Sequence, residues 1–91
     1  MPSYLVETYL GRGRADERAA HERRVRSEAA ALARRGMIVR FGCAFHMPED
    51  ELCFYVLDAP SRCKAALVAR RAGLEPLRVV EAVPFGEGVQ R

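Results

Sequence analysis

Two cysteines and one histidine lie close together in the middle of the chain, in the segment RFGCAFHMPEDELCFYVLDAP of residues 40–60. Thiolate sulfur and imidazole nitrogen are donors that nickel, zinc and copper ions bind. The segment has two apolar stretches around a Pro-Glu-Asp turn, which predicts a β-hairpin. If the turn places His46 opposite Cys53, their side chains point the same way, with Cβ atoms about 5 Å apart. Cys43 is an odd number of residues from His46, so strict alternation places it on the other face.

His46 and Cys53 are therefore the candidate metal ligands, but they make only half of a four-ligand site. A partner subunit or Glu51 would have to supply the other ligands. The alternative interpretation is structural. The cysteines would then be small buried apolar side chains, and His46 would cap the rim of the hairpin.

A second candidate site is an apolar pocket between the helices and the sheet. Its expected lining is one helical histidine and four aromatic strand residues: His21, Phe41, Phe45, Phe54 and Tyr55. An enzyme with such a pocket would use His21 or His46 as its proton carrier, because imidazole titrates near neutral pH. The alternative is that the aromatic residues form ordinary core and that His21 is a satisfied, partly buried side chain.

Nucleophilic catalysis has little support in the sequence. Cys63 follows the predicted start of a helix, but no histidine is expected beside it. The Gly-Arg-Gly at residues 11–13 lacks the third glycine and the Lys-Ser/Thr ending of phosphate-binding loops. The sequence therefore predicts no catalytic residue.

The chain has 91 residues, which predicts one domain over residues 1–91. Its net charge is +3, from 15 Lys and Arg against 12 Asp and Glu. Acidic residues interleave with the arginines of residues 12–35, so we expect no nucleic-acid partner. No stretch resembles a signal peptide or a membrane span, so we also expect no membrane partner. The three cysteines form no CxxC pair, which favours reduced thiols and a cytoplasmic location.

Hydrophobic periodicity predicts four strands and two helices. The strands are expected at residues 3–10, 37–47, 52–57 and 76–83. The helices are expected at residues 15–35 and from residues 58–61 to about residue 72, each followed by a glycine that ends it. The first helix has an apolar stripe that comprises His21, Val25, Ala29 and Leu32. Residues 84–91 are expected to form a glycine-containing tail.

The order β-α-β-β-α-β predicts a ferredoxin-like fold of the α+β class, a four-stranded antiparallel sheet with two helices on one face. Alternation in the second strand places Phe41, Cys43 and Phe45 on one face, with Ala44 and His46 on the other. Both faces of the hairpin are thus apolar, whereas one face of an antiparallel sheet is usually polar. A chain this short cannot cover both faces, so we expect a homodimer in which two sheets pack together.

Several short motifs recur here in the order seen in a family of small bacterial proteins. They are the opening Tyr4–Glu7, the turn Pro48–Glu51, the pairs Cys53-Phe54 and Ala59-Pro60, and the closing Ala72–Val83. In their order and spacing the chain resembles the nickel-binding-protein-like family of ferredoxin-like domains of unknown function. The resemblance implies a ferredoxin-like fold and homodimerisation, and nickel binding in some members. It assigns no ligand residues.

We therefore expect a cytoplasmic homodimer that binds rather than catalyses, with nickel or another divalent transition metal as its first candidate ligand. One alternative is a dimeric α+β barrel enzyme, of monooxygenase or isomerase type, with an apolar substrate and His21 or His46 in proton transfer. Another is a non-catalytic interaction module.

Overall fold

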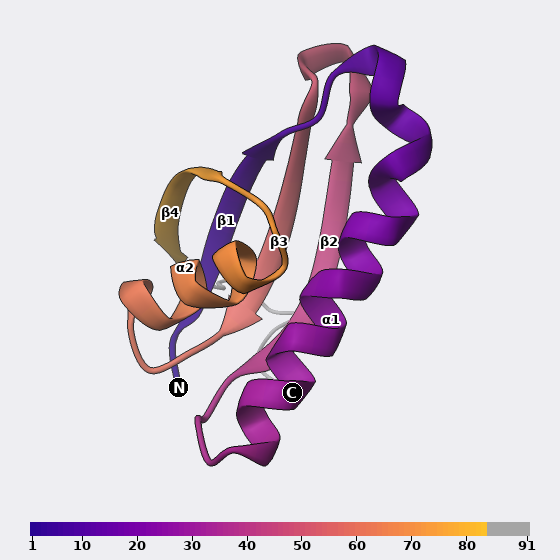
Figure 1. The fold of residues 1–91 in the computed structure, drawn as a ribbon. Coiled ribbons are helices and arrows are strands. Elements are labelled where there is room, and N and C mark those ends of the chain that lie inside the picture. Colours follow the sequence, from indigo (N-terminus) through magenta and orange to yellow (C-terminus); the bar gives the residue numbers. More distant parts are fainter. Residues whose placement is uncertain (84–91) are drawn as a thin grey trace.

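The computed structural model describes residues 1–83, which form one four-stranded antiparallel sheet with two α-helices on one face (Figure 1). The elements in chain order are β1 (Ser3–Tyr9), the 3₁₀-helix η1 (Arg12–Glu17), α1 (Arg18–Arg34), β2 (Arg40–Met47), the 3₁₀-helix η2 (Pro48–Asp50), β3 (Leu52–Asp58), α2 (Arg62–Arg71) and β4 (Pro76–Ala82). The strands lie in the order β2-β3-β1-β4. This confirms the predicted ferredoxin-like α+β fold. The expected tail at residues 84–91 lies outside the described residues.

The first helix and the second strand begin later than the periodicity predicts. Residues 12–17 form a 3₁₀-helix, and the α-helix starts at Arg18. After α1, Gly36 adopts a φ of 95° and the Met37 N–H donates to the Leu32 carbonyl at 3.0 Å. This left-handed closing turn is a common helix ending. It occupies residues that the alternation had assigned to the strand, so β2 starts at Arg40.

Each helix covers a different half of the sheet. α1 packs on β2, and α2 packs on β1 and β4 (Figure 1). The predicted stripe of α1 is confirmed, because the buried residues of this helix are His21, Val25, Ala29 and Leu32. α2 buries mainly small residues, which are Ala65, Ala66, Val68 and Ala69. The Ser61 hydroxyl caps α2 by accepting from the Lys64 N–H at 3.2 Å.

A bulge in β2 changes which side chains share a face. The register of β2 on β3 shifts between Phe41 and Cys43, which leaves Gly42 as the extra residue. A Cβ atom at Gly42 would lie 3.1 Å from the Val56 carbonyl oxygen, so the backbones approach closely there. The predicted grouping of Phe41 with Cys43 is wrong, because strict alternation does not survive the extra residue.

The helix-covered face of the hairpin therefore carries Phe41, Ala44 and His46 from β2, next to the buried β3 residues Cys53, Tyr55 and Leu57. Neither helix of the described part of the chain lies over the opposite face of the sheet. Its apolar side chains come from all four strands: Leu5, Tyr9, Cys43, Phe45, Met47, Leu52, Phe54, Val56 and Val80. We call this the open face. Tyr9 and Phe45 are 57% and 55% exposed there, and the prediction of a hairpin with two apolar faces is confirmed.

Candidate functional site: a polar cavity under the first helix

His46 and Cys53 are direct partners in the β2–β3 register, on the face that α1 covers. A cavity of about 20 Å³ lies beside them. Its lining comes from three elements: Arg18 and Glu22 of α1, Ala44, Phe45 and His46 of β2, and Cys53 and Tyr55 of β3. The hairpin thus brings the two predicted ligands together, and the start of α1 closes over them.

Two buried polar atoms of the cavity lining have no hydrogen-bond partner among the described residues. They are Nε2 of His46 and the hydroxyl oxygen of Tyr55. Tyr55 is only 1% exposed. Buried polar groups in proteins are nearly always paired with protein atoms, water or an ion. Two such atoms at one small cavity therefore mark a place where a ligand, an ion or a water molecule would restore lost interactions.

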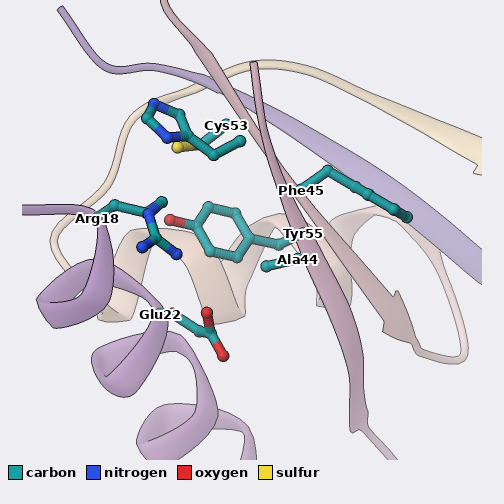
Figure 2. A pocket seen from close by; sticks show the side chains of 7 residues that line it. Arg18, Glu22, Ala44, Phe45, Cys53 and Tyr55 are labelled. Atoms are coloured by element: carbon teal, nitrogen blue, oxygen red, sulfur yellow. The ribbon is translucent and has the colours of Figure 1, made fainter. Parts of the chain in front are cut away.

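Burial controls the protonation of the cavity side chains. It raises the pKa of the Cys53 thiol, an effect that Tyr55 and the Arg18 cation oppose. Burial also raises the pKa of the Tyr55 hydroxyl, and neighbouring Cys53 and Glu22 raise it further. Both groups are therefore protonated at neutral pH. In Figure 2 the Tyr55 hydroxyl and the Arg18 guanidinium point toward one another, with Glu22 below them.

The structure does not complete the predicted metal site. Within residues 1–83, no group of three or more His, Cys, Asp or Glu side chains is placed to hold a metal ion. Cys43 lies on the open face, as the parity argument expected. Glu51, the other suggested ligand, accepts from the Arg12 N–H at 2.9 Å through its carboxylate. The described residues thus provide His46 and Cys53, with Tyr55 as a neighbouring oxygen donor.

The five residues predicted to line an apolar pocket do not converge. Phe45 and Phe54 are neighbours on the open face, and the Phe45 ring points away from the cavity in Figure 2. Phe41 lies on the other face, where the Arg26 guanidinium stacks 4.3 Å from its ring centre. The bulge at Gly42 sends Phe41 and Phe45 to opposite faces, and the period of two along β3 does the same for the adjacent residues Phe54 and Tyr55.

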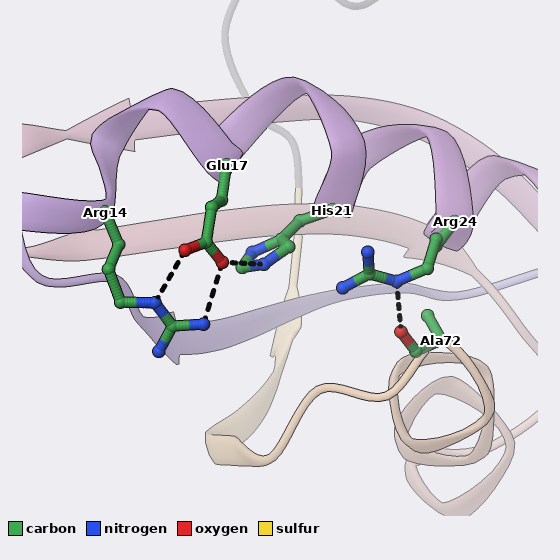
Figure 3. A network of polar contacts seen from close by, with 5 residues as sticks. All are labelled: Arg14, Glu17, His21, Arg24 and Ala72. Atoms are coloured by element: carbon green, nitrogen blue, oxygen red, sulfur yellow. Dashed lines mark hydrogen bonds and ion pairs between the residues drawn. The ribbon is translucent and has the colours of Figure 1, made fainter.

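His21 is buried on α1, but in a separate network (Figure 3). Its Nε2 lies 3.5 Å from a carboxylate oxygen of Glu17. Arg14 donates two hydrogen bonds to the same carboxylate, at 2.9 and 2.8 Å. His21 and His46 therefore belong to different sites.

Two lining residues, Arg18 and Glu22, were not singled out by the sequence. They lie one turn apart on α1, seven positions before Val25 and Ala29 respectively, so they extend the buried stripe toward the start of the helix. This spacing of seven residues was the available signal. Cys63, by contrast, is exposed on α2. It lines neither the cavity beside His46 nor the surroundings of His21.

No helix among the described residues has the length and apolarity needed to cross a membrane. No family model matches the chain, and no curated protein sequence is significantly similar to it. A similar solved structure is the crystal structure of SCO4226 from Streptomyces coelicolor A3(2). It superposes with a TM-score of 0.69 at 16% identity, over 93% of this chain and 99% of that one. At this identity the likeness concerns the fold, and the chain shares its ferredoxin-like architecture with SCO4226.

Proposed function

We propose that this protein is a small homodimeric binding domain that takes up a divalent transition-metal ion at the His46–Cys53 cavity. One observation carries the metal proposal: the histidine and the cysteine are direct cross-strand partners beside a buried polar cavity. Nickel is the first candidate because of the family resemblance, and zinc and copper share its preference for nitrogen and sulfur donors.

The size of the cavity supports an ion rather than an organic ligand. Pockets for drug-sized molecules measure about 300–1,000 Å³, whereas this cavity has about 20 Å³. That space suffices for one water molecule or one ion. The donor atoms also suit a metal ion. Nε2 of His46 is buried without a hydrogen-bond partner among the described residues, and a bound cation would give it one.

The number of donors predicts how tightly the ion is held. Structural zinc sites use four protein ligands, and sites with fewer keep positions open for water or exchange. Two protein ligands, with the Tyr55 hydroxyl nearby, correspond to the second class. The bound ion would supply the positive charge that holds Cys53 as a thiolate. The nearby Arg18 cation weakens the binding of a metal ion, and the Glu22 carboxylate offsets this repulsion.

The open face supports the homodimer. The two arginines that the described strands place on it are already paired with carboxylates, Arg40 with Asp58 at 2.7 Å and Arg78 with Glu7 at 3.3 Å. Among residues 1–83, a nucleic-acid phosphate would find no cation on this sheet surface that lacks a carboxylate partner. A second copy of the same apolar face fits better, because a two-fold dimer buries identical patches against one another.

The partner on the open face would not complete the metal site. His46 and Cys53 lie on the helix-covered face, and the sheet itself separates them from the open face. The metal proposal and the dimer proposal are therefore independent, and each needs its own test.

The test of metal binding is isothermal titration of the protein with Ni²⁺ and Zn²⁺, combined with sulfur-to-metal charge-transfer absorption after Ni²⁺ or Co²⁺ addition. We expect saturable binding that Cys53→Ser and His46→Ala remove. The matched control is Cys63→Ser, which removes an exposed thiol and should leave binding and absorption unchanged. Absence of binding to the unmodified protein, or equal loss in Cys63→Ser, would overturn the proposal.

A further inference from the structure

A second cavity lies on the other side of α1 and shares no lining residue with the metal cavity. It is a cleft of about 350 Å³ between the start of α1, the end of β1 and the loop that joins α2 to β4. Its volume falls within the range of about 300–1,000 Å³ that is typical of small-molecule sites.

One wall of the cleft is a row of charged and polar side chains on α1 and η1 (Figure 3). Arg14 and Glu17 neutralise one another through two hydrogen bonds. Glu17 also lies 3.5 Å from Nε2 of His21, which orients the imidazole. His21 is 7% exposed, so a polar side chain more than nine-tenths buried lines this cleft.

The imidazole of His21 is neutral at pH 7. Burial and the neighbouring Arg24 and Arg14 cations lower its pKa, and Glu17 only partly compensates. A neutral imidazole has one N–H donor and one acceptor nitrogen. With Nε2 directed at Glu17, the remaining nitrogen is the acceptor.

Arg24 continues the same wall one turn further along α1. Its Nε donates to the Ala72 carbonyl at 2.8 Å, at the end of α2. This bond fixes the guanidinium between the two helices, and no other bond of this side chain to the described residues uses its terminal nitrogens. A guanidinium held in this way is preorganised to bind a carboxylate. The facing wall adds apolar surface through Leu74 of the loop and Leu77 of β4, and Leu77 is 59% exposed.

We propose that this cleft binds a small organic acid that carries an apolar group. Arg24 binds the carboxylate, Leu74 and Leu77 contact the apolar group, and the neutral imidazole of His21 accepts a hydrogen bond from a donor on the ligand. Of the four charged side chains that line the cleft, Arg14 and Glu17 cancel. Glu75, on the loop, also lines the cleft, and its carboxylate opposes the attraction that Arg24 exerts on the ligand.

The test is a nuclear magnetic resonance titration of the ¹⁵N-labelled full chain with 3-phenyllactate as the probe, because its hydroxyl supplies the donor that His21 would accept from. We expect saturable shifts at the amides of Thr8, Leu74 and Leu77. The neutral analogue 3-phenyllactamide keeps the hydroxyl and the phenyl group, and it should bind about tenfold more weakly because it lacks the charge that Arg24 recognises.

Three variants should change the affinity for the acid in three different ways. Arg24→Gln should weaken binding of the acid about tenfold, and Glu75→Gln should strengthen it. Arg23→Gln removes a neighbouring exposed arginine that does not line the cleft, and it should change affinity less than about twofold. Unchanged dispersion of the spectra establishes that each variant is folded.

The amide comparison uses the unmodified protein, so it decides the proposal even if a variant fails to fold. The proposal is overturned if the acid gives no saturable shifts, if acid and amide bind equally, or if Arg24→Gln and Arg23→Gln behave alike.

Discussion

His46 lies directly opposite Cys53 in the β2–β3 register, and the pair faces a cavity that the first turns of α1 cover. This relationship joins a nitrogen and a sulfur donor at a place shielded from bulk water. It also places the pair away from the open face, so the two candidate sites lie on opposite sides of one hairpin. The inner side holds the candidate metal site, and the outer side is the candidate dimer interface.

Metal uptake at this site should depend strongly on pH. Burial raises the pKa of the Cys53 thiol, so the thiol is protonated at neutral pH and the metal must displace its proton. Apparent affinity should therefore rise with pH by about tenfold per unit while one proton is released. Titrations with Ni²⁺ in two buffers of different ionisation enthalpy measure the number of protons released. An affinity that stays constant with pH would mean that Cys53 is not a ligand.

A charged residue on the open face should dissociate the dimer. Phe45 pairs with Phe54 there, and Phe45→Glu would bury an unpaired carboxylate in the sheet-to-sheet contact. We expect a dimer mass for the unmodified protein and a monomer mass for this variant by light scattering. Ile38→Glu is the matched control, since Ile38 is 67% exposed but lies outside the four strands. A monomeric unmodified protein, or dissociation in both variants, would refute this interface.

The β2 bulge should make Gly42 intolerant of a side chain. A Cβ at this position would lie 3.1 Å from the Val56 carbonyl oxygen, which is closer than ordinary contact. Gly42→Ala should lower the free energy of unfolding by about 1 kcal/mol. In Gly13→Ala the added Cβ meets no atom within 4 Å, so this control should change stability by less than about 0.5 kcal/mol. Urea denaturation compares the two, and equal stabilities would show that the bulge accommodates the extra atom.

Asp58 should link stability to pH in the acid range. Its carboxylate accepts from the Ser3 hydroxyl at 2.6 Å and from Arg40 at 2.7 Å. The Ser3 hydrogen bond, followed by the contacts with Arg40, lowers its pKa below the ordinary value of 3.8. As the pH falls, Asp58 therefore takes up a proton at a higher pH in the unfolded chain than in the folded protein. The stabilisation is complete well above pH 3.8 and is lost as the pH falls through the lower folded value.

The corresponding measurement is urea denaturation between about pH 6 and pH 2. Asp58→Asn should flatten the decline in stability at the acid end. Asp50→Asn, at an exposed position of the hairpin turn, should leave the decline unchanged. Identical pH profiles for Asp58→Asn and the unmodified protein would contradict the linkage.

Much of the fold follows from local patterns along the chain. The α1 stripe from His21 to Leu32 was predicted because residues spaced by three and four positions share a helix face. The succession of strands and helices along the chain is that of a ferredoxin-like fold, and this fold fixes the order of the strands in the sheet. The pairing of His46 with Cys53 depends on a tight turn at residues 48–50, which the Pro-Glu-Asp signal indicated.

Other features depend on contacts between distant segments. The sequence could not reveal the bulge at Gly42, because glycine is compatible with both a regular strand and a bulge, and the Val56 backbone decides between them. The predicted aromatic pocket failed for the same reason, since the face that each strand presents depends on its register with its neighbours.

By itself, the sequence determined the element types, the buried helix stripe and the excess of apolar residues in the hairpin. These are properties of nearest neighbours and of simple periods. The tertiary structure decided which side of the hairpin α1 covers, and it brought Arg18 and Glu22 to the His46–Cys53 pair. It also placed Arg24 against Ala72 at the second cleft. Such placements arise when helices and strands far apart in the chain pack together, and no local pattern encodes them.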